Sequence, residues 1–208
     1  MMRDSIVNNL LINGPLMPPP VAQTEIYAAS LPLRPCVGVV LFNAQGHVWV
    51  GRHRPRWAAL KESYVGDAVW QLPQGGIEPR EPSREAAFRE LWEETGVRNA
   101  SLIGEIPGWL TYELPPELIG IALKGKYAGH RLRWYAMRFD GDDSEIDIGP
   151  KGPMKSEFDA WRWVPLVEVP SLAVDFRRAV YEEVVQEFAC FARRRATPVG
   201  ALDVAAAK

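Results

Sequence analysis

The stretch from Gly75 to Val97, GGIEPREPSREAAFRELWEETGV, constrains the fold of this chain more than any other. Pro82 suits the first turn of a helix, and Gly96 suits the left-handed residue that ends one. The residues between them are mostly strong helix formers and include no helix breaker. We therefore predict a helix between these two residues. Its mostly apolar face would consist of Phe88, Leu91, Trp92 and Thr95.

The same helix would carry three carboxylates, Glu90, Glu93 and Glu94, on one face. Residues three and four apart are neighbours on a helix, roughly 5–6 Å apart at their β-carbons. At an effective dielectric constant near 20, each pair of like charges about 5 Å apart costs roughly 3 kcal/mol. Arg89 can offset part of this repulsion by reaching Glu85 or Glu93, and a divalent cation would offset more. Oxygen-only ligands favour hard ions, so we expect Mg²⁺ or Mn²⁺; a solvated acidic face is the alternative.

The residues that flank the carboxylates add a longer pattern. Gly75, Glu81 and the run from Arg89 to Val97 match the Nudix box of the Nudix hydrolases at every defined position. This resemblance implies a loop–helix–loop that binds a divalent metal, and hydrolysis of a nucleoside diphosphate linked to another group. It also implies a metal-site role for Gly75, because a glycine lets the backbone approach the metal and the phosphates closely.

Composition restricts the partners and the compartment. The length of 208 residues suits one domain with a sizeable core, and the net charge of −2 gives no general attraction to DNA or to an anionic membrane. No apolar run approaches the length of a membrane span. Cys36 and Cys190 are the two cysteines, which we expect to be free thiols in the cytoplasm. We expect most of the eight tryptophans in the core and some stacked on nucleobases. The sequence leaves the oligomeric state open.

The chain divides into one domain with two extensions. Residues 1–30 contain a run of three prolines and no sustained hydrophobic period, so we predict a disordered N-terminal extension. Met17 is an alternative start. The domain would span residues 31–195, and residues 196–208 would form a flexible C-terminal tail.

Hydrophobic patterns within this domain predict strands around the central helix. Residues 36–42 and 47–53 would form a hairpin, and an irregular insertion at 57–68 would lead to a short strand at 70–76. Further strands are expected at 101–106, 109–113, around 130–137 and at 157–164, and a packed helix at 176–194. These elements predict an α/β fold. The Nudix resemblance also implies an α/β/α sandwich with a mixed central sheet.

Segments outside the box narrow the resemblance. RPCVGVVLFN, WQLPQGGIEP, GHRLRWYAMRF, SEFDAWRWV and DFRRAVYEEVVQEFA resemble the bacterial RNA pyrophosphohydrolase and dinucleoside polyphosphate hydrolase branch, from about Arg34 to Ala189. This likeness implies metal binding by Glu90, Glu93, Glu94 and Glu157. It implies base contacts by Val174 and Phe176, and basic contacts by Arg34, Arg52 and Arg177. Where the branch has GQxQKW this chain has GHRLRW, so Leu132 replaces a polar residue.

The expected chemistry is hydrolysis of a polyphosphate linkage. Glu94 or Glu157 would accept a proton from water, and Arg89 is a further catalytic candidate. Arg131 and Arg133 alternate onto one strand face, and we expect one of them or Arg52 to meet the phosphates, at the opposite end of the groove from Phe176. The substrate would be a nucleotide or an RNA 5′ end.

Several functions are compatible with that chemistry. The substrates that we expect are triphosphorylated RNA, which would lose pyrophosphate, and dinucleoside polyphosphates such as diadenosine tetraphosphate. Nucleotide sugars and oxidised dNTPs are alternative substrates. A non-catalytic nucleotide sensor and a scaffold with an acidic surface helix are alternatives of another class.

Overall fold

The structure is a computed structural model that describes residues 30–53, 70–152 and 156–192. The expectations for the N-terminal extension with Met17, for the insertion at 57–68 and for the C-terminal tail lie outside these residues.

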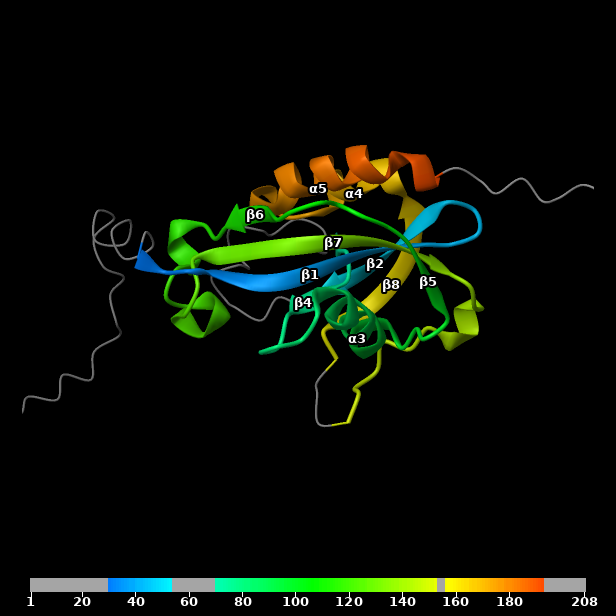
Figure 1. Ribbon diagram of the computed structural model, residues 1–208, viewed down its shortest axis with the longest axis horizontal. Helices are drawn as coiled ribbons and strands as arrows, with labels where there is room; N and C mark the ends of the chain where they lie inside the picture. Colours follow the sequence, from blue (N-terminus) through cyan, green and yellow to red (C-terminus); the bar gives the residue numbers. More distant parts are fainter. Residues whose placement is uncertain (1–29, 54–69, 153–155, 193–208) are drawn as a thin grey trace, which may run out of the picture.

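A mixed sheet forms the middle of the molecule (Figure 1). Its described strands are β1 (Leu33–Phe42), β2 (His47–His53), β3 (Trp70–Gln71), β4 (Gln74–Gly76), β5 (Ala100–Glu105), β6 (Leu110–Glu113), β7 (Gly129–Phe139) and β8 (Phe158–Pro165). The order β3-β2-β1-β7-β5 runs across the sheet. β1 and β7 pair in parallel along the whole of β1, whereas β4, β6 and β8 add antiparallel to β1, β7 and β2.

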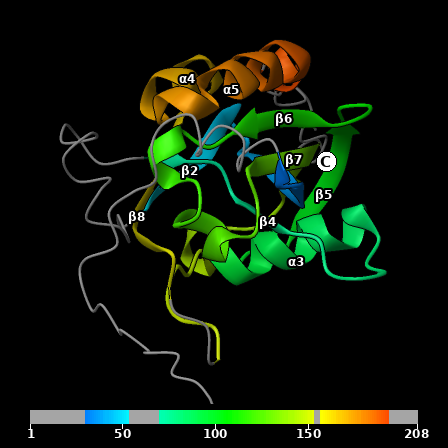
Figure 2. The same ribbon diagram turned by 90° about the vertical axis from the view of Figure 1, so that its left-hand side faces the viewer.

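Helices cover both faces of this sheet (Figure 2). α3 (Ser83–Thr95) lies on one face, and α4 (Val169–Leu172) and α5 (Asp175–Phe188) lie on the other. Short 3₁₀ turns occur at Pro116–Leu118, Ala122–Gly125, Asp143–Glu145, Leu166–Glu168 and Ala189–Ala192. The predicted α/β sandwich with a mixed sheet is confirmed. None of the described helices combines the length and the apolar character needed to cross a membrane.

Alternation along the strands divides the core into two layers. Cys36, Val40, Leu132 and Trp134 pack in the layer under α5, together with Val180, Val184 and Phe188 of that helix. Val37, Val39, Leu41, Tyr135 and Met137 pack in the layer under α3. The predicted alternation in β7 is therefore confirmed. Leu132, where the family branch has a polar residue, is a fully buried core residue.

Two predicted strand arrangements need correction. β1 begins at Leu33, and its contact with β2 is limited to the pair of Phe42 with Val48, so the expected hairpin is short. β2 pairs mainly with β8, while β4 pairs with the middle of β1, from Cys36 to Gly38. The expected strand at 70–76 is split into β3 and β4. Pro73 lies between β3 and β4 and has no N–H to donate to a neighbouring strand. The carbonyl oxygen of Pro73 accepts the N–H of Val39 at 2.8 Å.

Helix α3 ends where the sequence predicted, but it faces the sheet differently. Gly96 has a φ of 77° and donates its N–H to the carbonyl of Trp92. The buried residues are Ala86, Ala87, Glu90, Leu91, Glu94 and Thr95. The predicted apolar face was wrong for Phe88, which is 36% exposed, and for Trp92, which is half-buried beneath Arg98. Ala86 and Ala87 are small, so the helix lies close to the sheet. The carboxylates of Glu90 and Glu94 are buried on the same side of the helix.

Candidate active site

Strand β4 separates two charged groups, and its glycines make room for both. Gly75 pairs with Val37 and Gly76 pairs with Cys36, so their missing side chains would point to opposite faces of the sheet. A β-carbon on Gly75 would lie 2.0 Å from the carboxylate carbon of Glu90. A β-carbon on Gly76 would lie 2.3 Å from Nη2 of Arg34. The two glycines therefore let a carboxylate and a guanidinium lie directly against the same strand.

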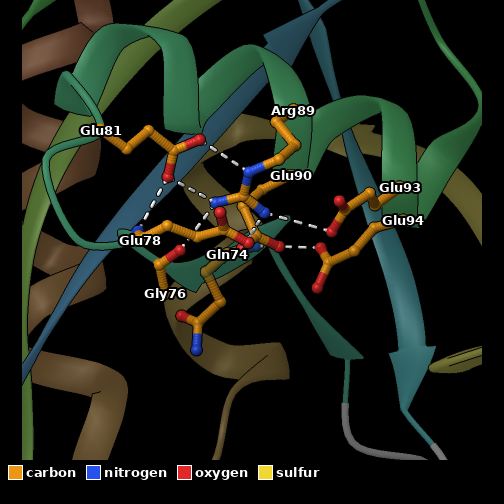
Figure 3. Close-up of polar contacts among 8 residues, drawn as sticks. All are labelled: Gln74, Gly76, Glu78, Glu81, Arg89, Glu90, Glu93 and Glu94. Atoms are coloured by element: carbon orange, nitrogen blue, oxygen red, sulfur yellow. Dashed lines mark hydrogen bonds and ion pairs between the residues drawn. The ribbon is translucent and has the colours of Figure 1, made fainter. Parts of the chain in front are cut away.

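Arg89 connects helix α3 to the loop that precedes it (Figure 3). Its Nε and Nη2 donate to the carboxylate of Glu81 at 2.7 and 2.8 Å, and Nη2 also donates to the carbonyl of Gly76 at 2.8 Å. Its Nη1 contacts Glu90 at 2.8 Å and Glu93 at 3.2 Å. The expected contact with Glu93 is present, and the second partner is Glu81 instead of Glu85. The hydrogen bond with Arg89 lowers the pKa of Glu81.

Glu94 is a buried carboxyl group with little positive charge beside it. It accepts the backbone N–H of Gln74 at 3.0 Å. Burial raises its pKa well above the usual value, and the charges of Glu157 and Glu90 raise it further. Glu157, just before β8, approaches closely enough to share a hydrogen bond with it. Burial also raises the pKa of Glu90, although Arg89 opposes this shift.

These carboxylates have the chemistry of a site for a hard cation. All their donor atoms are oxygen, and the buried charge of Glu94 needs a proton or a cation to balance it. Among residues 30–53, 70–152 and 156–192, no three acidic, histidine or cysteine side chains already converge as a metal cage. The reason is visible in Figure 3: Arg89 draws Glu90 and Glu93 to itself, while Glu94 turns towards Gln74. A cation would compete for the same oxygens, and the residues fit one.

The other side of β4 carries aromatic and polar groups centred on Tyr112. Its hydroxyl accepts Nε2–H of Gln74 at 3.3 Å, and its ring centroid lies 5.6 Å from that of Phe176. The guanidinium of Arg177 lies 5.4 Å from the same ring, and its Nη1 donates to Oε1 of Gln71. Val174 caps the start of α5 beside them. Arg34 also faces this side.

Buried polar atoms without a partner gather at Tyr112. Within the part of the chain that the structure describes, Oε1 of Gln74, Nδ1 of His130 and Nε of Arg177 have none. The Tyr112 and His130 rings lie 5.1 Å apart. Unpaired buried polar atoms are costly, so this cluster suits a ligand that offers both donors and acceptors. His130 is buried, which lowers its pKa to about 3.

The remaining candidate arginines lie apart from this cluster. Arg52 pairs with Asp159 at 2.6 Å on neighbouring strands. Arg131 and Arg133 lie over the ring of Trp109 on the α3 face of the sheet, as the alternation of β7 requires. Phe176 packs against the opposite face. The structure therefore brings Arg34 and Arg177, not these three arginines, close to the cluster, because, besides burial, the charges of both lower the pKa of His130.

Two contributors to the site had no role in the sequence analysis. Gln74 supplies an N–H to Glu94 and a side chain to Tyr112, so it connects both halves of the site. The signal for it was its position directly before the two glycines. Tyr112 had no signal beyond lying in a predicted strand. Glu81 was noted for its place in the box, but its bond to Arg89 follows only from the folded loop.

The fold and the site define the class of the protein. The family model of the NUDIX domain matches residues 32–185, so this chain belongs to the NUDIX family. Two curated relatives are RNA pyrophosphohydrolases. That of Rhizobium meliloti (strain 1021) is 54% identical over 168 residues, which cover 80% of this chain and 99% of the relative. That of Agrobacterium fabrum (strain C58) is 52% identical over 165 residues, which cover 78% and 95%.

Solved structures agree on the fold. A Caenorhabditis elegans Ap4A hydrolase in a binary complex has a TM-score of 0.51 and 16% identity, with 76% of this chain and 99% of that chain covered. The Escherichia coli dihydroneopterin triphosphate pyrophosphohydrolase has a TM-score of 0.52 and 18% identity, with 75% and 99% covered. At these identities the likeness shows the fold alone.

Proposed function

We propose that this protein is a metal-dependent hydrolase that removes pyrophosphate from the 5′ end of triphosphorylated RNA. The observation that carries the proposal is the buried carboxyl group of Glu94, next to the charges of Glu157 and Glu90 and hydrogen-bonded to the N–H that precedes the glycine strand. The RNA pyrophosphohydrolase names of relatives about half identical to this chain, which it matches over nearly their whole length, favour RNA over the other polyphosphates.

The metal would be Mg²⁺, with Mn²⁺ as a substitute. Glu90, Glu93, Glu94 and Glu157 would hold it, with the backbone at Gly75 close by. When bound, such an ion lowers the pKa of a water molecule and neutralises phosphate oxygens. Arg89 acts on this set as a positioning residue, because its hydrogen bonds to Glu81 and Gly76 fix the point from which it holds Glu90 and Glu93.

The proton from the attacking water would pass to the pair of Glu94 and Glu157. In addition to burial, the charge of Glu157 favours a proton on Glu94, because a nearby like charge raises the pKa of a carboxyl group. The raised pKa of Glu94 suits a group that must take a proton near neutral pH. The water oxygen would bond to one of the two phosphorus atoms that share the α–β bridging oxygen, and the bond from that phosphorus to the bridging oxygen would break. Pyrophosphate would leave, and the RNA would retain a 5′-monophosphate.

The opposite side of β4 would bind the substrate. Arg34, which lies against Gly76, and Arg177, which lies beside Tyr112, would supply positive charge to the leaving phosphates, which gain charge in the transition state. Phe176 would stack on a base, with Val174 beside it. The unpartnered atoms of Gln74, His130 and Arg177 would hydrogen-bond the polar edge of that base. Arg52 is paired with Asp159, so it would contribute after exchanging that partner.

A product analysis tests this proposal. The protein is incubated with Mg²⁺ and either triphosphorylated RNA or diadenosine tetraphosphate, with the Glu94→Gln variant as control. We expect pyrophosphate and 5′-monophosphate RNA as the main products, formed with a higher kcat/KM than ATP and AMP from diadenosine tetraphosphate. A preference for the dinucleotide, or no metal-dependent release from RNA, would overturn the proposal.

A further inference from the structure

The surface around Trp109 has no role in the site described so far. Trp109 precedes β6, and its side chain is 39% exposed. The guanidinium carbons of Arg131 and Arg133 lie 4.8 and 5.9 Å from the centroid of its ring. Arg131 is exposed and Arg133 is half-buried. We call these three residues the Trp109 surface.

The charge of the Trp109 surface is unbalanced. Two other surface arginines have acidic partners: Arg84 pairs with Glu105, and Arg138 of the same strand pairs with Asp140 at 2.8 Å. Arg98 and Arg162 each lie over a single tryptophan ring, whereas two arginines share the ring of Trp109. Within the described ranges, no carboxylate lies within ion-pair distance of either arginine of the Trp109 surface. Glu113 follows two positions beyond the β6 residue that pairs with Arg131, and Glu105 of β5, which pairs with Arg84, lies opposite Tyr135. An exposed indole with two guanidinium groups suits a ligand that is both anionic and aromatic.

Strand pairing places this surface close to the carboxylates. Arg133 pairs with Val37, and Val37 pairs with Gly75, against which the carboxylate of Glu90 lies. Paired residues share a face of the sheet, and neighbouring strands are about 4.8 Å apart, so the Cα atoms of Arg133 and Gly75 lie about 10 Å apart. The Trp109 surface and the carboxylates therefore belong to one face of the molecule, a short distance from each other.

We propose that the Trp109 surface binds the single-stranded RNA that follows the 5′ end held at the carboxylates. This inference rests on the function proposed above. A base would stack on the indole and phosphates would contact the two guanidinium groups, which together bind single strands with little sequence preference. A long RNA would cover more of this surface than a nucleoside triphosphate. Long RNA should therefore gain affinity from it, and a nucleoside triphosphate should gain much less.

The test compares two substrate lengths in two variants, Trp109→Ala and the double variant Arg131→Gln, Arg133→Gln. For a triphosphorylated RNA of about ten nucleotides, we expect KM to rise about five- to twentyfold, since stacking and phosphate contacts are lost. The kinetic constants for a nucleoside triphosphate should change much less. A plot of log kcat/KM against the logarithm of the salt concentration has a negative slope. For the double variant this slope should be shallower by about 1.4, because two phosphate contacts are lost.

Matched controls separate this effect from misfolding. Trp109→Phe keeps a stacking ring and should retain most of the affinity for long RNA. Arg138→Gln removes an arginine of the same strand that is paired with Asp140, and should leave both substrates unaffected. Melting temperatures of all variants show whether the fold is intact. Unchanged KM for long RNA in folded variants, or equal losses for both lengths, would overturn the proposal and leave an acidic protein as the partner of this surface.

A binding measurement keeps this inference separate from the proposed function. If the wild-type protein released no pyrophosphate from RNA, the proposed function would fail. Fluorescence anisotropy with a 5′-hydroxyl RNA oligomer would then still test the surface. Tighter binding by the wild type than by Trp109→Ala supports the Trp109 surface, and equal binding overturns it.

Discussion

A carboxyl group buried beside a second carboxyl group must hold a proton or meet a cation, and Glu94 is in that position. Its neighbours are the N–H of Gln74, the carboxyl of Glu157 and the charge of Glu90. Removing its charge should therefore affect chemistry more than folding. Burial of a neutral amide of the same shape at this point also lowers the repulsion between carboxylates.

For Glu94→Gln we expect turnover to fall at least a hundredfold, because metal binding and proton transfer both need the carboxylate. The melting temperature of the metal-free protein should not fall much. Steady-state kinetics over a Mg²⁺ titration provide the measurement. Glu85→Gln, on an exposed position of the same helix, is the matched control. Full activity of the Glu94 variant at saturating Mg²⁺ would remove α3 from the mechanism.

Phe176 tests how the base is held. In Phe176→Ala we expect KM to rise about ten- to a hundredfold with little change in kcat, the pattern of binding lost equally from substrate and transition state. Part of the ring packs on Tyr112, so a modest drop in melting temperature accompanies the change. Phe88→Ala, an exposed ring on the other side of the sheet, should change neither constant. A sharp loss of stability with KM intact would make Phe176 a core residue.

His130 should make stability depend on pH. Burial lowers its pKa in the fold to about 3, whereas the unfolded chain takes up a proton near pH 6.5. As the pH falls below 6.5, the unfolded state binds more protons, so the free energy of unfolding decreases by up to about 1.4 kcal/mol per pH unit. In His130→Gln the slope between pH 6.5 and 5 should become shallower. Chemical denaturation at several pH values measures it, with His47→Gln at an exposed position as control. An unchanged slope would contradict the assigned burial.

At the scale of elements, the site depends on how closely α3 lies against β4. A hydrogen bond of 2.7 Å between the hydroxyls of Ser83 and Tyr135 connects the first turn of α3 to β7. The carboxylate of Glu90 then occupies the space that a side chain on Gly75 would need. Contact between the two elements, more than either element alone, sets the position of the carboxylates.

Two glycine variants distinguish an effect on the contact between α3 and β4 from an effect on folding stability alone. Gly75→Ala should lower turnover at least tenfold, because the new methyl group would displace the carboxylate of Glu90. Gly96→Ala places a side chain at a φ of 77°, so it should cost about 1–2 kcal/mol of stability and leave kcat nearly unchanged. Kinetics and thermal unfolding of both variants provide the comparison. Normal turnover in Gly75→Ala would mean that Glu90 moves freely.

The two ends of α3 and the alternation of β7 could be predicted because each depends on residues close together in sequence. Gly96 ends the helix through its own backbone, and Arg131 shares a face with Tyr135 because side chains alternate. The burial of Glu90 could not be predicted, since it depends on the missing side chain of Gly75, fifteen residues earlier. The exposure of Phe88 follows from the same contact.

Contacts between residues far apart in the sequence could not be predicted for a similar reason. Arg52 had no visible partner, because Asp159 lies more than a hundred residues later. The neighbours of β1 were also hidden: a buried apolar strand does not indicate which strands it joins. The pattern identified the carboxylates of the site, but the cluster at Tyr112 needed the pairing of β6 with β7.

At the scale of the whole molecule, the described domain begins beside Ser30, just before β1. The carbonyl of Pro32 accepts the N–H of Ala128, so this point is already part of the fold. We therefore expect that a truncated protein beginning at Leu31 retains the melting temperature and the Mg²⁺-dependent activity of the full chain. Differential scanning calorimetry and pyrophosphate release check both. Loss of either would assign a structural or catalytic role to the removed residues.

The parallel pairing of β1 with β7 also has a consequence for synthesis on the ribosome. Leu33 pairs with Gly129, so the central strand lacks one neighbour until nearly a hundred further residues have been made. At about 5–20 residues per second, the strand stays open along that edge for roughly 5–20 s. Its run of valines and leucine would be accessible to chaperones and proteases during this interval. A nascent chain arrested before Gly129 should be cleaved within β1, whereas one that has released Phe139 should be protected.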